Sequence, residues 1–269
     1  MQSFNWISRL CTGIISLCLI SCHSTQAPNT LVVGTISGPE TELMDVAQKV
    51  ASERYGVNIK IVEFNDYNLP NIALQDGTLD ANVYQHQPYL DTAMQANNYT
   101  FEVIGKTFLY PTGIYSERFK RLQDLPAGAL IALPNDPSNE TRALLLLQQA
   151  GLIKLRPGLK PGISTNFHDI YRNIRHLKFK EMDAAQLPRI LPDVDAAIIN
   201  TTFAIPAGLN PTTDAIYIEN KQSPYANIIA IRSDSNKREL LKILVKSLNS
   251  DEVKEKALQL FGQAALPAW

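Results

Sequence analysis

Hydrophobic and polar positions follow one another along this chain in blocks that predict strands and helices in turn. Apolar residues dominate 31–36 and alternate with polar residues over 57–64, as in strands. Between these blocks, 40–55 carries apolar side chains on one helical face, and Gly56 is placed to end the helix as its C′ residue. Further strands are predicted at 79–84, 129–133, 194–199, 215–218 and 228–231, and further helices at 71–75, 88–96, 139–150, 237–248 and 251–260. The alternation predicts an α/β fold with largely parallel sheets, in which 194–199 and 215–218 are buried strands.

The N-terminal 22 residues have a different pattern. A lone Arg9 precedes an apolar run over 10–20, and the run ends in Ser21-Cys22. The run is too short to span a bilayer, which takes about 20 apolar residues, and its layout is typical of a secretory signal. The ending resembles the lipobox of bacterial lipoproteins, in which the cysteine becomes the lipid-modified first residue. We expect a signal peptide over 1–21, lipidation at Cys22 and a flexible polar stalk over 22–30. The alternative is an ordinary signal with an incidental cysteine.

Composition limits what the mature chain can be. Its 248 residues suffice for one large domain or two of about 120. Loss of Arg9 leaves 24 basic and 26 acidic side chains, so there is no basic stripe of the kind that nucleic-acid-binding proteins carry. Cys11 and Cys18 leave with the signal, so no disulfide, thiolate nucleophile or cysteine metal site is expected. No later segment reaches the length of a transmembrane helix.

Enzyme signatures are missing from the sequence. It holds no phosphate-binding glycine loop, no Gly-x-Ser-x-Gly elbow and no His-Glu-x-x-His helix. The four histidines are not paired at metal-ligand spacing: His23, His86, His168 and His176. We therefore predict a protein that is not an enzyme and that has no cofactor and no metal site.

Residues 80–91 are unusual for a connection between a strand and a helix. The segment places Tyr84, His86 and Tyr89 at the end of a predicted strand. In α/β proteins ligands bind at the carboxyl ends of the strands, which makes this a candidate site. The alternative is that both tyrosines pack into the core while His86 caps the helix.

A second candidate segment covers 134–142, where a proline-bracketed turn leads into a helix. Asp136 or Ser138 is placed to cap that helix. The unpaired N–H groups of a helix N-terminus suit a carboxylate, and Arg142 in the first turn is positioned to add a bidentate ion pair. The alternative is an arginine on a solvated helix face.

The chain resembles the methionine-binding lipoproteins of ABC uptake transporters. The similar segments run in order through nearly the whole mature chain: 80–91, 105–109, 134–139, 142–147, 151–155, 177–181, 184–189, 197–201 and 223–228. The resemblance implies a periplasmic-binding-protein fold (type II) with two α/β lobes and a ligand cleft between them. One lobe would comprise 31–110 and 230–269, and the other 111–229.

The same resemblance implies roles for individual residues. Arg142 would pair with the α-carboxylate of the ligand, supported by Asn139 and the helix N-terminus. Asn200 and Asn227 would hydrogen-bond the amino-acid head group, since amides both donate and accept. The side-chain pocket would be formed by Tyr67, Tyr84, His86 and Tyr89. Such a pocket suits a thioether, because aromatic edges attract polarizable sulfur, and a histidine N–H would add a weak donor toward it.

The sequence departs from the family pattern at Tyr84 and at the pair Glu140-Thr141. The position of Tyr84 is usually phenylalanine, so its hydroxyl needs a partner if it is buried. Glu140-Thr141 replaces what is often a pair of glycines. The Glu140 carboxylate must point away from a bound carboxylate or weaken its binding.

These features predict a monomeric protein that captures L-methionine and delivers it to the permease and ATPase of an ABC transporter. The lipid on Cys22 would hold it to a membrane of the cell envelope, facing the periplasm. His23 leaves the choice between inner and outer membrane open. Alternatives within this class are D-methionine, another apolar amino acid or a methionine-containing dipeptide as ligand. Alternatives outside it are a lipid-anchored hydrolase and a surface lipoprotein for interaction or adhesion.

Overall fold

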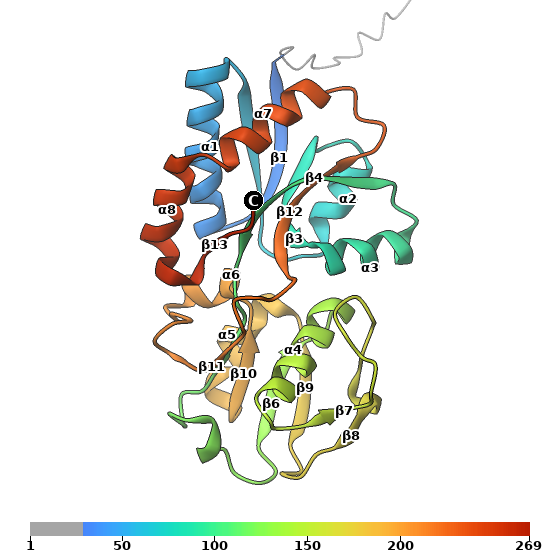
Figure 1. Cartoon of the computed structure of the whole chain (residues 1–269), viewed down its shortest axis with the longest axis vertical. Helices are drawn as coiled ribbons and strands as arrows, with labels where there is room; N and C mark the ends of the chain where they lie inside the picture. The colour runs from blue at the N-terminus through green and yellow to red at the C-terminus, as the bar shows by residue number, and fades with distance from the viewer. Residues whose placement is uncertain (1–28) are drawn as a thin grey trace, which may run out of the picture.

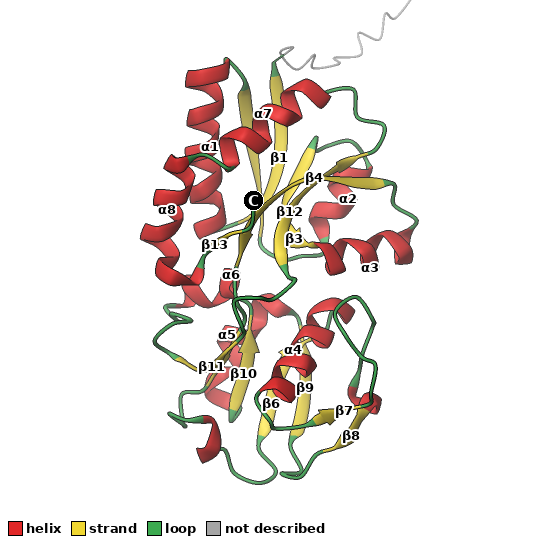
Figure 2. Cartoon of the chain, in the orientation of Figure 1, coloured by secondary structure: helices red, strands yellow, loops and turns green. Residues whose placement is uncertain are grey.

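Two mixed β-sheets, one in each half of the molecule, organise the chain (Figure 1). The computed structural model describes residues 29–269. The predicted signal peptide 1–21, Cys22 and most of the predicted stalk therefore lie outside the described residues. Helices pack on both faces of the first sheet and around the second, as predicted for an α/β fold (Figure 2).

The first lobe contains a six-stranded sheet in the order β13-β4-β12-β3-β1-β2. Its strands are β1 Thr30–Ile36, β2 Asn58–Phe64, β3 Ala81–His86, β4 Phe101–Leu109, β12 Ala226–Arg232 and β13 Leu266–Pro267. Its helices are α1 Pro39–Tyr55, α2 Leu69–Gln75, α3 Gln87–Asn97, α7 Arg238–Leu248 and α8 Asp251–Phe261.

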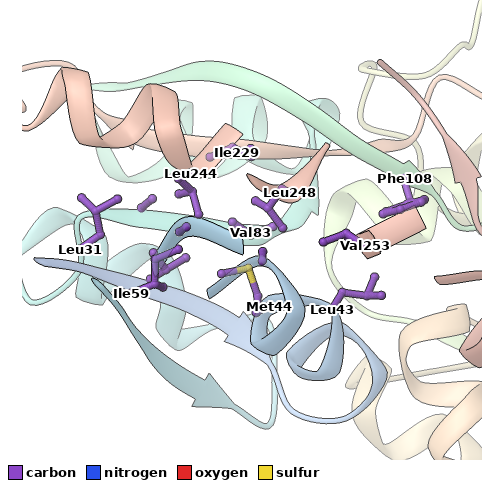
Figure 3. Close-up of a cluster of buried hydrophobic side chains, with 14 of the residues drawn as sticks. Leu31, Leu43, Met44, Ile59, Val83, Phe108, Ile229, Leu244, Leu248 and Val253 are labelled. Carbon is purple, nitrogen blue, oxygen red and sulfur yellow. The ribbon is translucent and has the colours of Figure 1, made fainter. Parts of the chain in front are cut away.

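Alternating side chains of this sheet fill two separate cores. Leu31 and Val83 pack with α1, α7 and α8, where Met44 and Leu244 are buried (Figure 3). Val32 points the other way, into a core with residues of α2 and α3. Because successive residues of a strand face opposite sides of the sheet, short apolar strands supply both layers.

The second lobe contains a five-stranded sheet in the order β11-β5-β10-β6-β9. Its strands are β5 Gly113–Tyr115, β6 Leu130–Pro134, β9 Lys178–Met182, β10 Ala196–Ile199 and β11 Ala215–Ile218, and a separate pair is β7 Lys154–Leu155 and β8 Ile170–Arg172. Its helices are α4 Pro137–Gln149, α5 Leu187–Ile190 and α6 Thr201–Ala204. The 3₁₀ helices of the chain are η1 Leu122–Asp124, η2 Phe167–Asp169, η3 Ala184–Gln186, η4 Leu191–Asp193, η5 Ile205–Ala207 and η6 Gly262–Ala264.

The chain crosses between the sheets twice, and the two crossing segments are hydrogen-bonded to each other. The Glu219 N–H donates to the Thr112 carbonyl over 2.9 Å, and the Thr112 N–H donates to Glu219 Oε2 over 3.2 Å. The expected return boundary between 229 and 230 falls inside β12, which pairs with β3 and β4 from Ala226 onward. The return crossing therefore lies between β11 and β12, at 219–225.

Most predicted elements exist within a few residues of their expected bounds, and three expectations need correction. The sheets are mixed rather than largely parallel, since β12 is antiparallel to both β3 and β4. The strand predicted at 215–218 is an edge strand, β11, and is only partly buried. No loop separates β3 from α3, because His86 ends the strand and Gln87 begins the helix.

Gly56 ends α1 as predicted, with a left-handed φ of 64°. Among residues 29–269, no helix has both the length and the apolar character needed to cross a membrane.

Candidate functional site

A cavity of about 340 Å³ lies at the junction of the lobes. It is lined by all eight residues singled out in the sequence, Tyr67, Tyr84, His86, Tyr89, Asn139, Arg142, Asn200 and Asn227. Four lining residues were not predicted: Gln85, Tyr110, Thr201 and Thr202. The space open to a water-sized molecule inside it is only about 20 Å³, so the lining side chains nearly fill the cavity in this arrangement.

The carboxyl ends of three strands supply most of this lining. His86 ends β3, Asn139 and Arg142 belong to α4 directly after β6, and Asn200 follows β10. In each lobe the side chains therefore come from the edge where α/β sheets bind ligands. Asn227 comes from β12, beside β3.

His86 both lines the cavity and caps α3. The prediction that it lies at the site and the alternative that it caps the helix are therefore compatible. Its Nδ1 accepts from the Tyr89 N–H over 3.2 Å. The ring proton is then on Nε2, which donates to Asn139 Oδ1 over 3.3 Å. Burial, followed by the nearby Arg142 charge, lowers the pKa of His86 to about 3 and keeps the ring neutral. Both ring nitrogens are occupied, so the expected N–H donor toward a thioether is not present.

Asn139 is held by the residue that caps its helix. Asp136 caps α4, as predicted, by accepting from the Asn139 N–H over 2.9 Å. Both Asp136 oxygens also accept from Asn139 Nδ2, over 3.1 and 3.0 Å. The amide N–H groups of Asn139 therefore face a carboxylate already in place. In this arrangement the N–H groups of the Asn139 side chain are used by Asp136, and the role of Asn139 toward a ligand carboxylate stays a prediction.

Arg142 is buried, with 4% of its side chain exposed, so the solvated-face alternative is wrong. Its Nε donates to Glu219 Oε1 over 3.0 Å, and its Nη2 to Glu219 Oε2 over 2.5 Å. Nη2 also donates to the Tyr110 carbonyl, and the guanidinium lies 4.6 Å from the centre of the Tyr225 ring. Nη1 has no hydrogen-bond partner among residues 29–269, so the guanidinium keeps donors that are not used within the protein.

Glu219 and Tyr225 contact the lining residues Arg142 and His86, and neither was predicted from the sequence. Glu219 directly follows β11, and Tyr225 directly precedes β12, so both lie in the return crossing. Tyr225 also makes an edge-on contact with His86, with ring centres 4.8 Å apart. The position of Glu219, directly after the predicted strand 215–218, was the one feature of the sequence that could have indicated a role at the site.

The aromatic wall is a cluster of three tyrosines. The Tyr67 ring centre lies 5.8 Å from that of Tyr84 and 5.9 Å from that of Tyr89. The hydroxyls of Tyr84 and Tyr89 both donate to the Tyr67 carbonyl, over 3.3 and 2.9 Å. The partner that the Tyr84 hydroxyl requires is therefore the Tyr67 backbone. Phe203 of α6 extends the wall, with its ring 4.9 Å from Tyr67.

Glu40, in the first turn of α1, reaches the site from behind Asn227 and Thr202. Its Oε1 accepts from Thr202 Oγ1 over 2.9 Å and from Asn227 Nδ2 over 3.3 Å. Its Oε2 is buried without a partner in the described part of the chain. Burial raises the pKa of Glu40 to about 8, and the hydroxyl of Thr202 opposes this only partly. Sequence reasoning missed Glu40, which reads as an ordinary first-turn acid.

Glu140 points away from the cavity, as a bound carboxylate would require. It is buried on the other side of α4 and is absent from the lining. Burial and then the neighbouring Glu181 raise its pKa to about 8. The departure at this position therefore adds no charge to the cavity wall.

Known proteins resemble this chain along nearly all of its length. Residues 31–269 match the family model described as NlpA lipoprotein. The D-methionine-binding lipoprotein MetQ of Escherichia coli K12 is 44% identical over 257 residues, which cover 94% of each chain. Outer membrane lipoprotein 3 of Mannheimia haemolytica is also 44% identical over 257 residues, 96% of each chain.

Solved structures agree with this assignment. A nutrient-binding protein from Burkholderia cenocepacia, bound to methionine, is 50% identical and superposes with a TM-score of 0.87 over 89% of this chain and 100% of that one. A periplasmic substrate-binding protein of an ABC transporter from Coxiella burnetii is 50% identical, with a TM-score of 0.85 over 88% and 100% of the two chains. These similarities confirm the predicted periplasmic-binding-protein fold and a binding protein rather than an enzyme. The chain therefore belongs to the NlpA lipoprotein family.

Proposed function

We propose that this protein is a lipid-anchored substrate-binding protein that captures L-methionine in the cavity between its lobes. The observation that carries the proposal is the union, in one cavity, of a free arginine Nη1, two asparagine amides and a wall of tyrosines. Arg142 Nη1 receives the ligand carboxylate, and Asn200 and Asn227 receive the amino group. Tyr67, Tyr84 and Tyr89 surround the thioether, to which aromatic edges contribute about 0.3–1.5 kcal/mol per contact.

Relatives support methionine as the ligand class but do not determine whether the ligand is the L- or the D-form. The Burkholderia cenocepacia structure contains methionine, and the MetQ relatives are named for D-methionine. We assign L-methionine as the ligand. D-methionine, another apolar amino acid and a methionine-containing dipeptide are the competitors within the same site.

Calorimetry on ligand-free protein tests this assignment. L-methionine, D-methionine, L-leucine and a methionine-containing dipeptide are titrated in parallel into refolded protein, so that copurified ligand is removed first. We expect the tightest binding for L-methionine. If D-methionine binds more tightly, the ligand is the D-form. If no methionine compound gives a heat of binding, the ligand class is rejected.

The delivery step follows from the same fold. Side chains from both lobes meet across the cavity, as in the bond from His86 of the first lobe to Asn139 of the second. A ligand held by both lobes favours the closed arrangement, because it binds that state better than an open one. We propose that the permease and ATPase of an ABC importer accept the liganded form, and that lipid on Cys22 keeps the protein at a periplasm-facing membrane.

A transport assay tests delivery and anchoring separately from binding. Deletion of the gene is expected to reduce uptake of labelled methionine, and the full chain is expected to restore it. A Cys22→Ala chain is expected to bind methionine normally in solution while leaving the membrane fraction. Unchanged uptake after deletion, in cells without a second methionine importer, contradicts the delivery role.

A further inference from the structure

A chain of hydrogen bonds determines which end of each asparagine amide faces the cavity. The Asp136 carboxylate only accepts, so Asn139 must present its Nδ2 to Asp136 and its Oδ1 to its other neighbours. Asn200 Nδ2 donates to that Oδ1 over 2.8 Å. The remaining atom, Asn200 Oδ1, is buried and has no partner within residues 29–269. Asn200 Oδ1 is therefore an acceptor without a donor, while Nδ2 uses one of its two hydrogens in the bond to Asn139.

Asn227 is oriented in the same sense by two acceptors. Its Nδ2 donates to the Tyr84 carbonyl over 3.1 Å and to Glu40 Oε1 over 3.3 Å. Both amide hydrogens are thus used, and Oδ1 is left without a bond to any described residue. Two asparagines from different lobes then present carbonyl oxygens, which suits a ligand group that has only donors.

Around the cavity, Glu40 and Asp136 are the acidic groups without a cationic partner among the described residues. Arg142 is paired with Glu219, and His86 is neutral. Tyr67 and Tyr110, which face Glu40, have pKa values raised by burial and then by Glu40, so they stay protonated. Thr202 and Asn227 bring no charge to it, and Asp136 lies beyond, with three N–H bonds from Asn139.

We propose that Glu40, acting through Asn227 and Thr202, makes the site for the ligand head group selective for a protonated amino group. Glu40 is a positioning residue in this subsite: it holds Asn227 and Thr202 and supplies the negative charge. The inference rests on the proposed function, which requires a ligand with an α-amino group. It predicts that Glu40 makes the site selective for an amine over the same molecule without one.

Proton release is the signature that a merely structural role would not give. With an empty cavity, the raised pKa of about 8 leaves Glu40 protonated at neutral pH, because an ionised carboxylate would be buried without a cation. A bound ammonium group supplies that cation and favours the carboxylate. Binding therefore releases a proton, and affinity rises by up to about tenfold per pH unit below pH 8.

Calorimetry at pH 7 and 8, in phosphate and in Tris, measures the released protons. The ligands are L-methionine and 4-(methylsulfanyl)butanoate, which lacks the amino group. For the wild-type protein we expect release of close to one proton per methionine at pH 7 and none with the analogue. Glu40→Gln is expected to abolish the proton release and to lower the affinity for methionine at least tenfold. The affinity for the analogue is expected to change less than threefold.

Glu140→Gln is the matched control, because Glu140 is also a buried glutamate with its pKa raised to about 8 but lies outside the cavity. It is expected to retain the full proton release. Methionine binding without proton release by the wild-type protein overturns this inference alone. Equal loss of both ligands in Glu40→Gln overturns it as well, whereas failure of the wild-type protein to bind methionine overturns the proposed function too. If Glu40→Gln does not fold, the wild-type proton count decides.

Discussion

Arg142 and Glu219 form a buried bidentate ion pair, with Nε–Oε1 and Nη2–Oε2 distances of 3.0 and 2.5 Å. The pair lies where the crossing segments meet α4. Arg142 also donates to the Tyr110 carbonyl in one crossing, and Glu219 accepts from the Thr112 N–H while lying in the other. One guanidinium therefore belongs both to the cavity wall and to the connection between the lobes.

Arg142→Ala is expected to lower the free energy of unfolding of the ligand-free protein by about 3–5 kcal/mol, because it leaves Glu219 buried without a cation. Denaturation by urea measures the change. Arg118→Ala serves as the control, since Arg118 pairs with Asp195 while half exposed; there we expect about 1 kcal/mol or less. Equal effects of the two substitutions would contradict a buried pair.

Tyr84→Phe is expected to change the free energy of unfolding by about 1 kcal/mol or less and methionine affinity by less than threefold. The substitution removes one hydroxyl, whose bond to the Tyr67 carbonyl is the longer of two at 3.3 Å. Tyr89 continues to satisfy that carbonyl. Urea denaturation and calorimetry measure the two effects. A loss of several kcal/mol would show that the hydroxyl does more than meet its own hydrogen-bonding need.

The stability of the ligand-free protein is expected to fall as the pH rises from 5 to 8. Burial raises the pKa of both Glu40 and Glu140 to about 8, against 4.5 as the ordinary value. The folded state then holds more protons than the unfolded state between these pH values. The stabilisation that the two protonated glutamates contribute is complete below about pH 4.5 and is lost as the pH rises through 8. Glu40 alone lowers the free energy of unfolding by at most about 1.4 kcal/mol for each pH unit in this range.

Thermal midpoints across this pH range, for the wild-type protein, Glu40→Gln and Glu140→Gln, measure the dependence. Each substitution is expected to flatten the curve and to raise the midpoint at pH 8. A curve for either variant that runs parallel to the wild type would exclude that glutamate as a source.

His86 is expected to remain neutral, with its proton on Nε2, from pH 8 down to pH 5. Its Nδ1 accepts from the Tyr89 backbone, and burial lowers the pKa of the ring to about 3. The ¹⁵N shifts of the ring, measured by NMR over this range, report both the tautomer and the charge. Titration of His86 above pH 5 would contradict its placement in a closed cavity.

Local spacing explains why so many elements were predictable. The apolar face of α1 and the glycine after it involve residues a few positions apart, and Gly56 indeed adopts the left-handed conformation there. The cap of α4 is equally local, since Asp136 bonds a residue three positions on. In such cases the residues that form the sequence pattern are the same residues that form the local structure.

The missed features join residues that are distant in the sequence. Glu219 meets Arg142 across 77 positions, and Glu40 meets Asn227 across 187. No periodicity reports such pairs. The resemblance to known lipoproteins named the lining residues, yet it did not say that Arg142 already has a carboxylate partner. The prediction of largely parallel sheets was wrong for a related reason. The chain returns from the other lobe before β12, which enters the sheet antiparallel to its neighbours.

The way β1 is held has a mechanical consequence. β1 begins at the end of the first lobe farthest from the second (Figure 1). The carbonyl of its first residue, Thr30, accepts from Lys237 Nζ over 3.0 Å. β1 also lies inside its sheet, between β3 and β2, so a pull on the N-terminal side loads two parallel neighbours in shear. A tether attached there would fix the first lobe as a rigid base. The second lobe, whose backbone continues from the first through the paired crossing segments, would lie outside that direct line of force.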